Sequence, residues 1–123
     1  MIQRLAEEQR LSGAVVQGGL VWLAGQVADD ASLDAEGQTA DILRQVDELL
    51  RQAGTDKSRL LSVTVVLADI SEAPAMNRAW DRWLDPAAKP ARMTIQAALV
   101  DPSWRVEITG VAALPAAPGA LRT

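Results

Sequence analysis

Residues 61–68, Leu-Ser-Val-Thr-Val-Val-Leu-Ala, set the pattern on which the fold of this 123-residue chain depends. Large aliphatic side chains at every second position alternate with a more polar set, which predicts a β-strand with one buried face. Residues 92–99 and 104–109 alternate in the same way further along the chain. Only Asp101-Pro102-Ser103 joins these last two segments, so we expect them to be antiparallel neighbours in a sheet.

Two segments around the 61–68 strand have helical periodicity. Residues 42–53 place aliphatic side chains at steps of three and four, with Asp34 as the expected N-cap and Gly54 as the expected stop. Residues 76–84 repeat Met, Ala, Trp and Leu at the same spacing, and Ser71 is the expected cap. These patterns predict two amphipathic helices.

The first part of the chain predicts strands. Residues 15–24 are typical of a hairpin with its turn at Gly18-Gly19, and a short strand is expected near Ile2. The order is then strand, strand, strand, helix, strand, helix, strand, strand. It predicts an α+β fold, a sheet with two helices packed on one face. The length suits one domain over residues 1–114, followed by a flexible Pro/Ala/Gly-rich tail over residues 115–123.

Composition excludes several kinds of chemistry. The chain has no His and no Cys, so it has no thiolate nucleophile, imidazole base, disulfide or Cys/His zinc site. The pairs Asp29-Asp30 and Asp81/Asp85 match no metal-site spacing, so no metal is expected. A net charge of −4 without a basic cluster argues against nucleic-acid partners. No apolar run approaches the length of about 20 residues that a membrane span needs, so no membrane partner is expected. We expect a cytoplasmic location.

The second face of the predicted sheet bears on assembly. It is expected to carry Thr64, Val66, Gln96 and Ala98, a mixture too apolar for an ordinary solvent-facing surface. Four Trp are the only aromatic residues, so the core has little bulk, and small cores often gain stability by oligomerising. The face is therefore a candidate contact between copies of the chain.

Arg92 and Glu107 are the candidate site residues. In the expected antiparallel pair they fall near the same level and could share a face of the sheet. One interpretation is a cross-strand ion pair, which is the commoner arrangement. The other is a site in which Arg92 holds an anionic ligand and Glu107 holds a water molecule. From residue patterns alone the ion pair is favoured.

Six short motifs follow one another along the chain: Ala24-Gly25-Gln26, Leu49-Leu50…Ala53-Gly54, Val63-Thr64-Val65-Val66-Leu67-Ala68-Asp69, Met76-Asn77-Arg78-Ala79-Trp80, Pro90-Ala91-Arg92 and Val106-Glu107-Ile108. Together they resemble one family, the YjgF/RidA/UK114 enamine/imine deaminases, formerly labelled L-PSP endoribonucleases, and the similarity extends roughly over residues 14–113. The resemblance implies a chorismate-mutase-like fold assembled as a homotrimer with pockets between subunits. It implies that Arg92 grips a substrate carboxylate and that Glu107 positions the hydrolytic water.

The resemblance also implies further pocket residues. The backbone near Thr94 and the turn at Gly25 would line the pocket, with Asn77 in support. Deaminase-type members often carry a tyrosine that reaches the neighbouring pocket, and Val15 stands in its place here. Without that hydroxyl, the resemblance implies a more apolar or roomier pocket with the arginine clamp retained.

The activity that the resemblance implies needs no cofactor. A 2-imino acid already has an electrophilic carbon, so a held carboxylate and an oriented water suffice for hydrolysis to a 2-keto acid and ammonia. With the family in view, the ligand-site interpretation of Arg92 and Glu107 is favoured over the ion pair. Two other functions remain open: a non-catalytic module that binds a small carboxylate or keto acid in the same pocket, and, with less support, an endoribonuclease or translation inhibitor.

Overall fold

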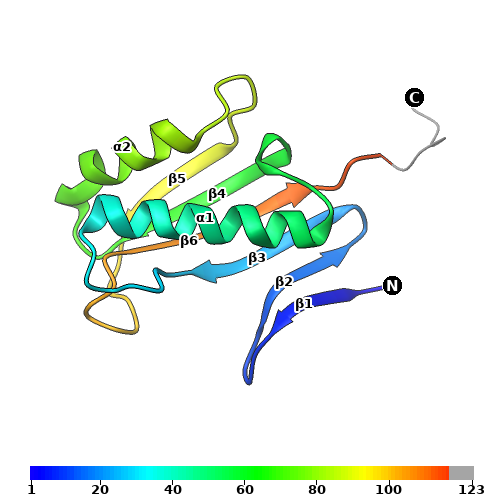
Figure 1. Cartoon of the computed structure of the whole chain (residues 1–123), viewed down its shortest axis with the longest axis horizontal. Coiled ribbons are helices and arrows are strands. Elements are labelled where there is room, and N and C mark those ends of the chain that lie inside the picture. Colours follow the sequence, from blue (N-terminus) through cyan, green and yellow to red (C-terminus); the bar gives the residue numbers. More distant parts are fainter. Residues whose placement is uncertain (117–123) are drawn as a thin grey trace.

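The computed structural model describes residues 1–116 and contains one six-stranded sheet with two helices on one face (Figure 1). The α+β fold and the order of elements are therefore confirmed. Most of the expected tail, from residue 117 onward, lies outside the described residues. The strands are β1 (Gln3–Glu7), β2 (Ser12–Gln17), β3 (Leu20–Gln26), β4 (Leu60–Leu67), β5 (Ala91–Gln96) and β6 (Val106–Ala113); the helices are α1 (Ala35–Ala53) and α2 (Ala73–Trp83), with short 3-10 turns η1 (Lys57–Arg59) and η2 (Ile70–Glu72).

The strands follow the order β1-β2-β3-β6-β4-β5, so the expected pairing of the last two strands is wrong. β4 lies between them: it pairs with β5 in parallel and with β6 antiparallel. The helix α2 joins β4 to β5, and a helical crossover of this kind produces a parallel pair. β5 also ends at Gln96 and β6 begins only at Val106, so the link is longer than Asp101-Pro102-Ser103 and reaches past one strand.

Local sequence signals explain where the elements begin and end. Asp34 caps α1 by accepting a hydrogen bond from the Gly37 amide, and Gly54 ends the helix with φ 89°, as expected. Gly18 and Gly19, with φ 63° and 78°, form the expected hairpin turn. Ser71 is not a helix cap: it lies inside η2, which Asp69 caps, and α2 begins after it.

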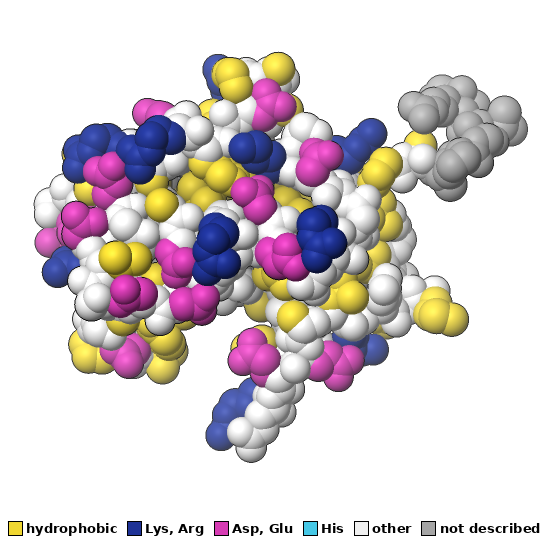
Figure 2. All heavy atoms as spheres, viewed as in Figure 1, with side chains coloured by type: hydrophobic (Ala, Val, Ile, Leu, Met, Phe, Trp, Pro, Cys, Tyr) yellow, Lys and Arg dark blue, Asp and Glu magenta, His cyan; other side chains and the backbone are white. Residues whose placement is uncertain are grey.

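The two helices cover one side of the sheet, where the buried side chains of β3 and β6 meet α1. Glu36 on α1 accepts hydrogen bonds from Arg78 and Arg82 on α2, and these bonds lower the pKa of its carboxyl group. On this face the acidic and basic side chains are interspersed and form no basic stripe (Figure 2). Within residues 1–116, neither helix is long and apolar enough to cross a membrane.

The alternation along β5 is opposite to the one expected. Arg92, Thr94 and Gln96 pair with Val63, Val65 and Leu67, which are buried beneath the helices, so these polar residues lie on the helix side. The other face of the sheet, which we call the open face, receives Met93 and Ile95, 55% and 40% exposed. Gln96 is therefore not on the open face, and Ala98 lies in the loop after β5. Thr64 and Val66 are there as expected, and with Trp22, Met93 and Ile95 the open face is more apolar than predicted.

Candidate functional site

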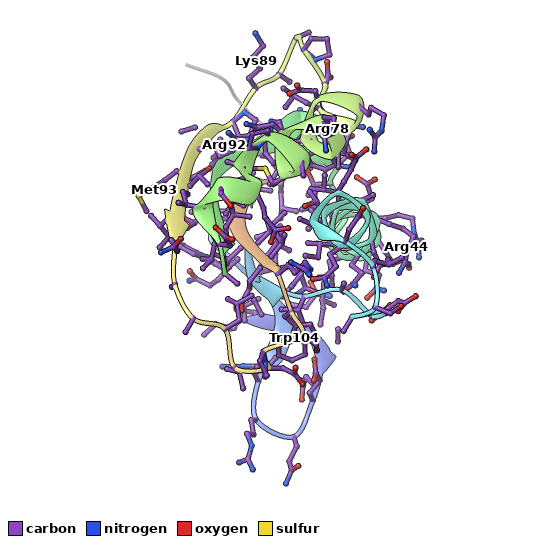
Figure 3. All side chains as sticks on the ribbon, turned by 90° about the vertical axis from the view of Figure 1, so that its left-hand side faces the viewer. Arg44, Arg78, Lys89, Arg92, Met93 and Trp104 are labelled. Atoms are coloured by element: carbon purple, nitrogen blue, oxygen red, sulfur yellow. The ribbon has the colours of Figure 1, made fainter. Side chains whose placement is uncertain are left out.

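Arg92 lies on the edge strand β5 and rests on side chains of α2. Its guanidinium carbon is 5.0 Å from the centre of the Trp80 ring, and its Nη1 is 3.8 Å from the sulfur of Met76. Met76 and Trp80 are four residues apart and therefore share one face of the helix. Figure 3 shows Arg92 on the α2 side of the strand and Met93 pointing away on the other side. Within the described chain Arg92 forms no salt bridge, although it is exposed.

Two buried polar atoms belong to the same side of the sheet. Thr94 follows Arg92 by two residues on β5, and Asn77 follows Met76 on α2. Thr94 Oγ1 and Asn77 Oδ1 are buried and have no hydrogen-bond partner within residues 1–116. Buried polar atoms normally have partners, so unsatisfied ones on the same side of the sheet as an unpaired guanidinium suit a ligand-binding surface. We call Arg92, Thr94 and Asn77 the arginine half-site.

Glu107 pairs with Val66 of β4. The neighbours of Val66, Val65 and Leu67, are buried beneath the helices, so Glu107 lies on the open face. Its carboxylate covers the backbone of Gly25 on β3. A Cβ added to Gly25 would overlap Glu107 Oε2 and come within 2.9 Å of Cδ. Gly25 is therefore needed as a glycine here so that the carboxylate fits over the strand. We call Glu107 and Gly25 the glutamate half-site.

A hollow of about 730 Å³ adjoins the glutamate half-site. It lies between the β1–β2 turn and the β5–β6 loop, which stand apart at the lower edge of the molecule in Figure 1. Glu107 and Gly25 contribute to its lining together with Leu11, Val100 and Trp104, and Trp104 is labelled in Figure 3. In the described part of the chain, the carboxylates form no group of three or more that could hold a metal ion.

The two half-sites lie on opposite faces of the sheet, and this overturns the expectation that Arg92 and Glu107 share a face. Arg92 pairs with Val63 and Glu107 with Val66, so β4 lies between them and their side chains point to opposite sides. The cross-strand ion pair within one chain is therefore wrong. Arg92 and Glu107 could share a face as a cross-strand pair only if β5 and β6 were adjacent, and β4 separates these two strands.

Val15, the residue in the place of the family tyrosine, lies on the open face. It pairs with Trp22, which pairs with Val111 of β6. Val111 is on the same face as Glu107 but four residues further along the strand, roughly 13 Å away. Within one chain, the structure brings Gly25 to Glu107 but leaves Val15 apart from both.

Sequence reasoning missed the contact of Arg92 with Met76 and Trp80. Their helical spacing predicted core packing, and both are indeed buried, at 0% and 5% exposure. The signal that could have revealed their second contact is the parallel strand–helix–strand order, which places the start of β5 beneath α2.

Comparison with known proteins agrees with the fold and with the expected family. The family model described as Endoribonuclease L-PSP matches residues 1–114. A RutC family protein of Haemophilus ducreyi is 43% identical over 114 residues, which cover 93% of this chain and 97% of that protein. A protein of Arabidopsis thaliana named Reactive Intermediate Deaminase A, chloroplastic, is 30% identical over 109 residues, 84% of this chain and 58% of that protein. The crystal structure of a YjgF-family member from Neisseria meningitidis superposes with a TM-score of 0.92 at 37% identity, covering 95% of this chain and 98% of that one. The chain therefore belongs to the YjgF/RidA family, whose family model carries the name Endoribonuclease L-PSP.

Proposed function

We propose that this protein hydrolyses 2-imino acids, such as 2-iminopropionate and its enamine tautomer 2-aminoacrylate, to 2-keto acids and ammonia. The observation that carries the proposal is the exposed Arg92 guanidinium, which lies on an indole ring and has no acidic partner within residues 1–116. The name of the Arabidopsis relative, Reactive Intermediate Deaminase A, supports the same activity.

The residues present suit this reaction. The guanidinium of Arg92 matches a substrate carboxylate through two parallel N–H···O bonds and fixes its orientation. Glu107 accepts a hydrogen bond from a water molecule and orients it toward the imine carbon. The water oxygen bonds to that carbon while its proton passes to the nitrogen, and the resulting carbinolamine loses ammonia as the keto group forms. Water is the only co-reactant.

The reaction requires both half-sites at one small substrate, and a single chain holds them on opposite faces. We therefore propose that Arg92 of one copy meets Glu107 of the next across their contact. Such a contact joins two different surfaces, and repeated around a closed ring it completes every site. We propose the ring of three copies that the family resemblance implies. The exposed apolar side chains of the open face, Trp22, Met93 and Ile95, support a buried contact there.

The test uses rapid mixing to measure the release of ammonia and 2-keto acid from freshly generated 2-imino acids. The side chain of the imino acid is made larger in steps. We expect the protein to accelerate hydrolysis over buffer and to show saturation. Saturable binding of the 2-keto acid without turnover would instead identify a carboxylate-binding module. Cleavage of RNA with no effect on imines would contradict the proposal in favour of a ribonuclease.

Gly25→Ala tests the role of the glutamate half-site. The added methyl group would overlap the Glu107 carboxylate, which must then rotate away from the strand. We expect kcat for imine hydrolysis to fall about tenfold or more, because the water that Glu107 orients would be misplaced. KM should change little, because Arg92 is untouched. Gly18→Ala is the control: it adds backbone strain at a hairpin turn with φ 63°, but its methyl group enters open space away from Glu107. Normal kcat in Gly25→Ala would contradict the assignment.

A further inference from the structure

We propose that Trp80, assisted by Met76, is a positioning residue that holds Arg92 in the conformation in which it receives a carboxylate. This inference rests on the proposed function and adds a determinant of ligand affinity to it. Trp80 reaches the ligand only through Arg92, and its two roles, in the core and under the guanidinium, are separable by experiment.

The environment of Arg92 differs from that of the arginines that form salt bridges in the described structure. Five arginines bind a carboxylate at 2.7–3.1 Å, and Arg92 instead lies over an aromatic ring. A carboxylate partner would order the side chain but would also occupy the guanidinium and neutralise its charge. An indole ring orders the side chain through its face and leaves the charge available. The five are Arg44, Arg51, Arg78, Arg82 and Arg105.

The geometry suits recognition of a planar anion. The guanidinium carbon lies over the Trp80 ring, 5.0 Å from its centre, and an indole ring offers no carboxylate or carbonyl oxygen as acceptor. The ring therefore leaves the N–H groups of Arg92 to an anionic ligand. The contact between Nη1 and the Met76 sulfur engages only a weak acceptor, which a carboxylate oxygen would replace easily. The bidentate edge of Arg92 therefore remains free for a ligand.

Trp80 and Met76 form a platform under Arg92. This platform is rigid, whereas an arginine side chain alone is not. Trp80 is 5% exposed and Met76 is fully buried, so both are fixed by the core packing between α2 and the sheet. A free arginine side chain carries about 2 kcal/mol of rotamer entropy that binding must remove. Contact with a fixed ring removes part of this entropy before the ligand arrives, and the gain appears as ligand affinity.

The test compares Trp80→Leu with Trp83→Leu, using pyruvate as the binding probe and 2-iminopropionate as substrate. Trp83 is the neighbouring indole, with its ring centre 5.5 Å from that of Trp80, and its own ring lies under Lys57 instead of Arg92. Both variants lose the same side-chain volume from the same helix, and thermal unfolding reports the stability of each. Trp83 is only half-buried and donates its Nε1–H to Asp47, whereas Trp80 is buried, so Trp80→Phe is needed as a second comparison to separate packing from the contact with Arg92.

We expect Trp80→Leu to raise the pyruvate Kd and the KM for the imine about fivefold to tenfold, with a smaller change in kcat. Trp80→Phe, which keeps an aromatic face, should recover most of this loss, and Trp83→Leu should bind pyruvate like the wild type. In NMR spectra the side-chain protons of Arg92 should be shifted by the Trp80 ring current in the wild type, and this shift should disappear in Trp80→Leu only.

Two results would overturn the inference while leaving the proposed function intact. One is an unchanged pyruvate Kd in a folded Trp80→Leu protein. The other is an equal rise in Kd in Trp83→Leu, which would show that the loss is one of general packing. A wild-type protein that neither binds pyruvate nor hydrolyses the imine would instead remove the proposed function, and with it the ligand for which Arg92 is held.

Discussion

Arg92→Ala is expected to lower kcat/KM for 2-imino acids about a hundredfold or more, the largest loss from any single substitution in the chain. The substitution removes two charge-assisted hydrogen bonds to the substrate carboxylate, each worth about 1.5–3 kcal/mol. Arg92 is exposed on an edge strand and takes part in no salt bridge of the described structure, so stability should change little. Stopped-flow rates of ammonia release at several imine concentrations measure the effect, and thermal unfolding checks the fold.

Arg92→Lys separates charge from shape. Lysine keeps the positive charge but presents a single ammonium in place of the planar fork, so we expect it to recover only part of the lost kcat/KM. Arg51→Ala is the control, because Arg51 is also exposed but lies on α1 and pairs with Glu48. Imine hydrolysis that survives in Arg92→Ala at the wild-type rate would exclude the clamp.

Much of the fold could be predicted from the sequence because its signals are local. The Asp34 cap, the Gly54 stop and the Gly18-Gly19 turn each depend on a few neighbouring residues, and the structure confirms all three. The order of the strands in the sheet has no such local signal, because it depends on segments far apart in the sequence. The short Asp101-Pro102-Ser103 link suggested a hairpin, but the crossover through α2 had already placed β5 at the outer edge of the sheet.

The face on which Arg92 lies could not be predicted for a related reason. Alternation gives two sets of residues but does not say which set faces the helices. On an interior strand the apolar set is the buried one. On β5 the apolar pair Met93 and Ile95 is exposed on the open face, and the polar set with Arg92 and Thr94 lies beside α2. This apolar set, directed away from the core, is the surface that the proposed contact between copies would cover.

Co-expression of Arg92→Ala with Glu107→Gln is expected to restore activity that neither variant has alone. If each site takes its arginine from one copy and its glutamate from the next, a mixed assembly contains complete sites. A complete site needs the arginine of a Glu107→Gln chain and the glutamate of an Arg92→Ala chain. With random mixing this occurs at about one quarter of the contacts in a ring, so about one quarter of the wild-type rate should return.

The matched control co-expresses Glu107→Gln with the double variant Arg92→Ala/Glu107→Gln. Every chain in that mixture lacks the glutamate, so no contact is complete and the rate should stay at that of Glu107→Gln alone. Native mass spectrometry verifies that both chains are present in each assembly and counts the copies. If the first mixture stays inactive although its assemblies are mixed, Arg92 and Glu107 do not act on one substrate across a contact. Their positions on opposite faces of one sheet would then require separate roles for the two residues, because no substrate as small as an imino acid reaches both within one chain.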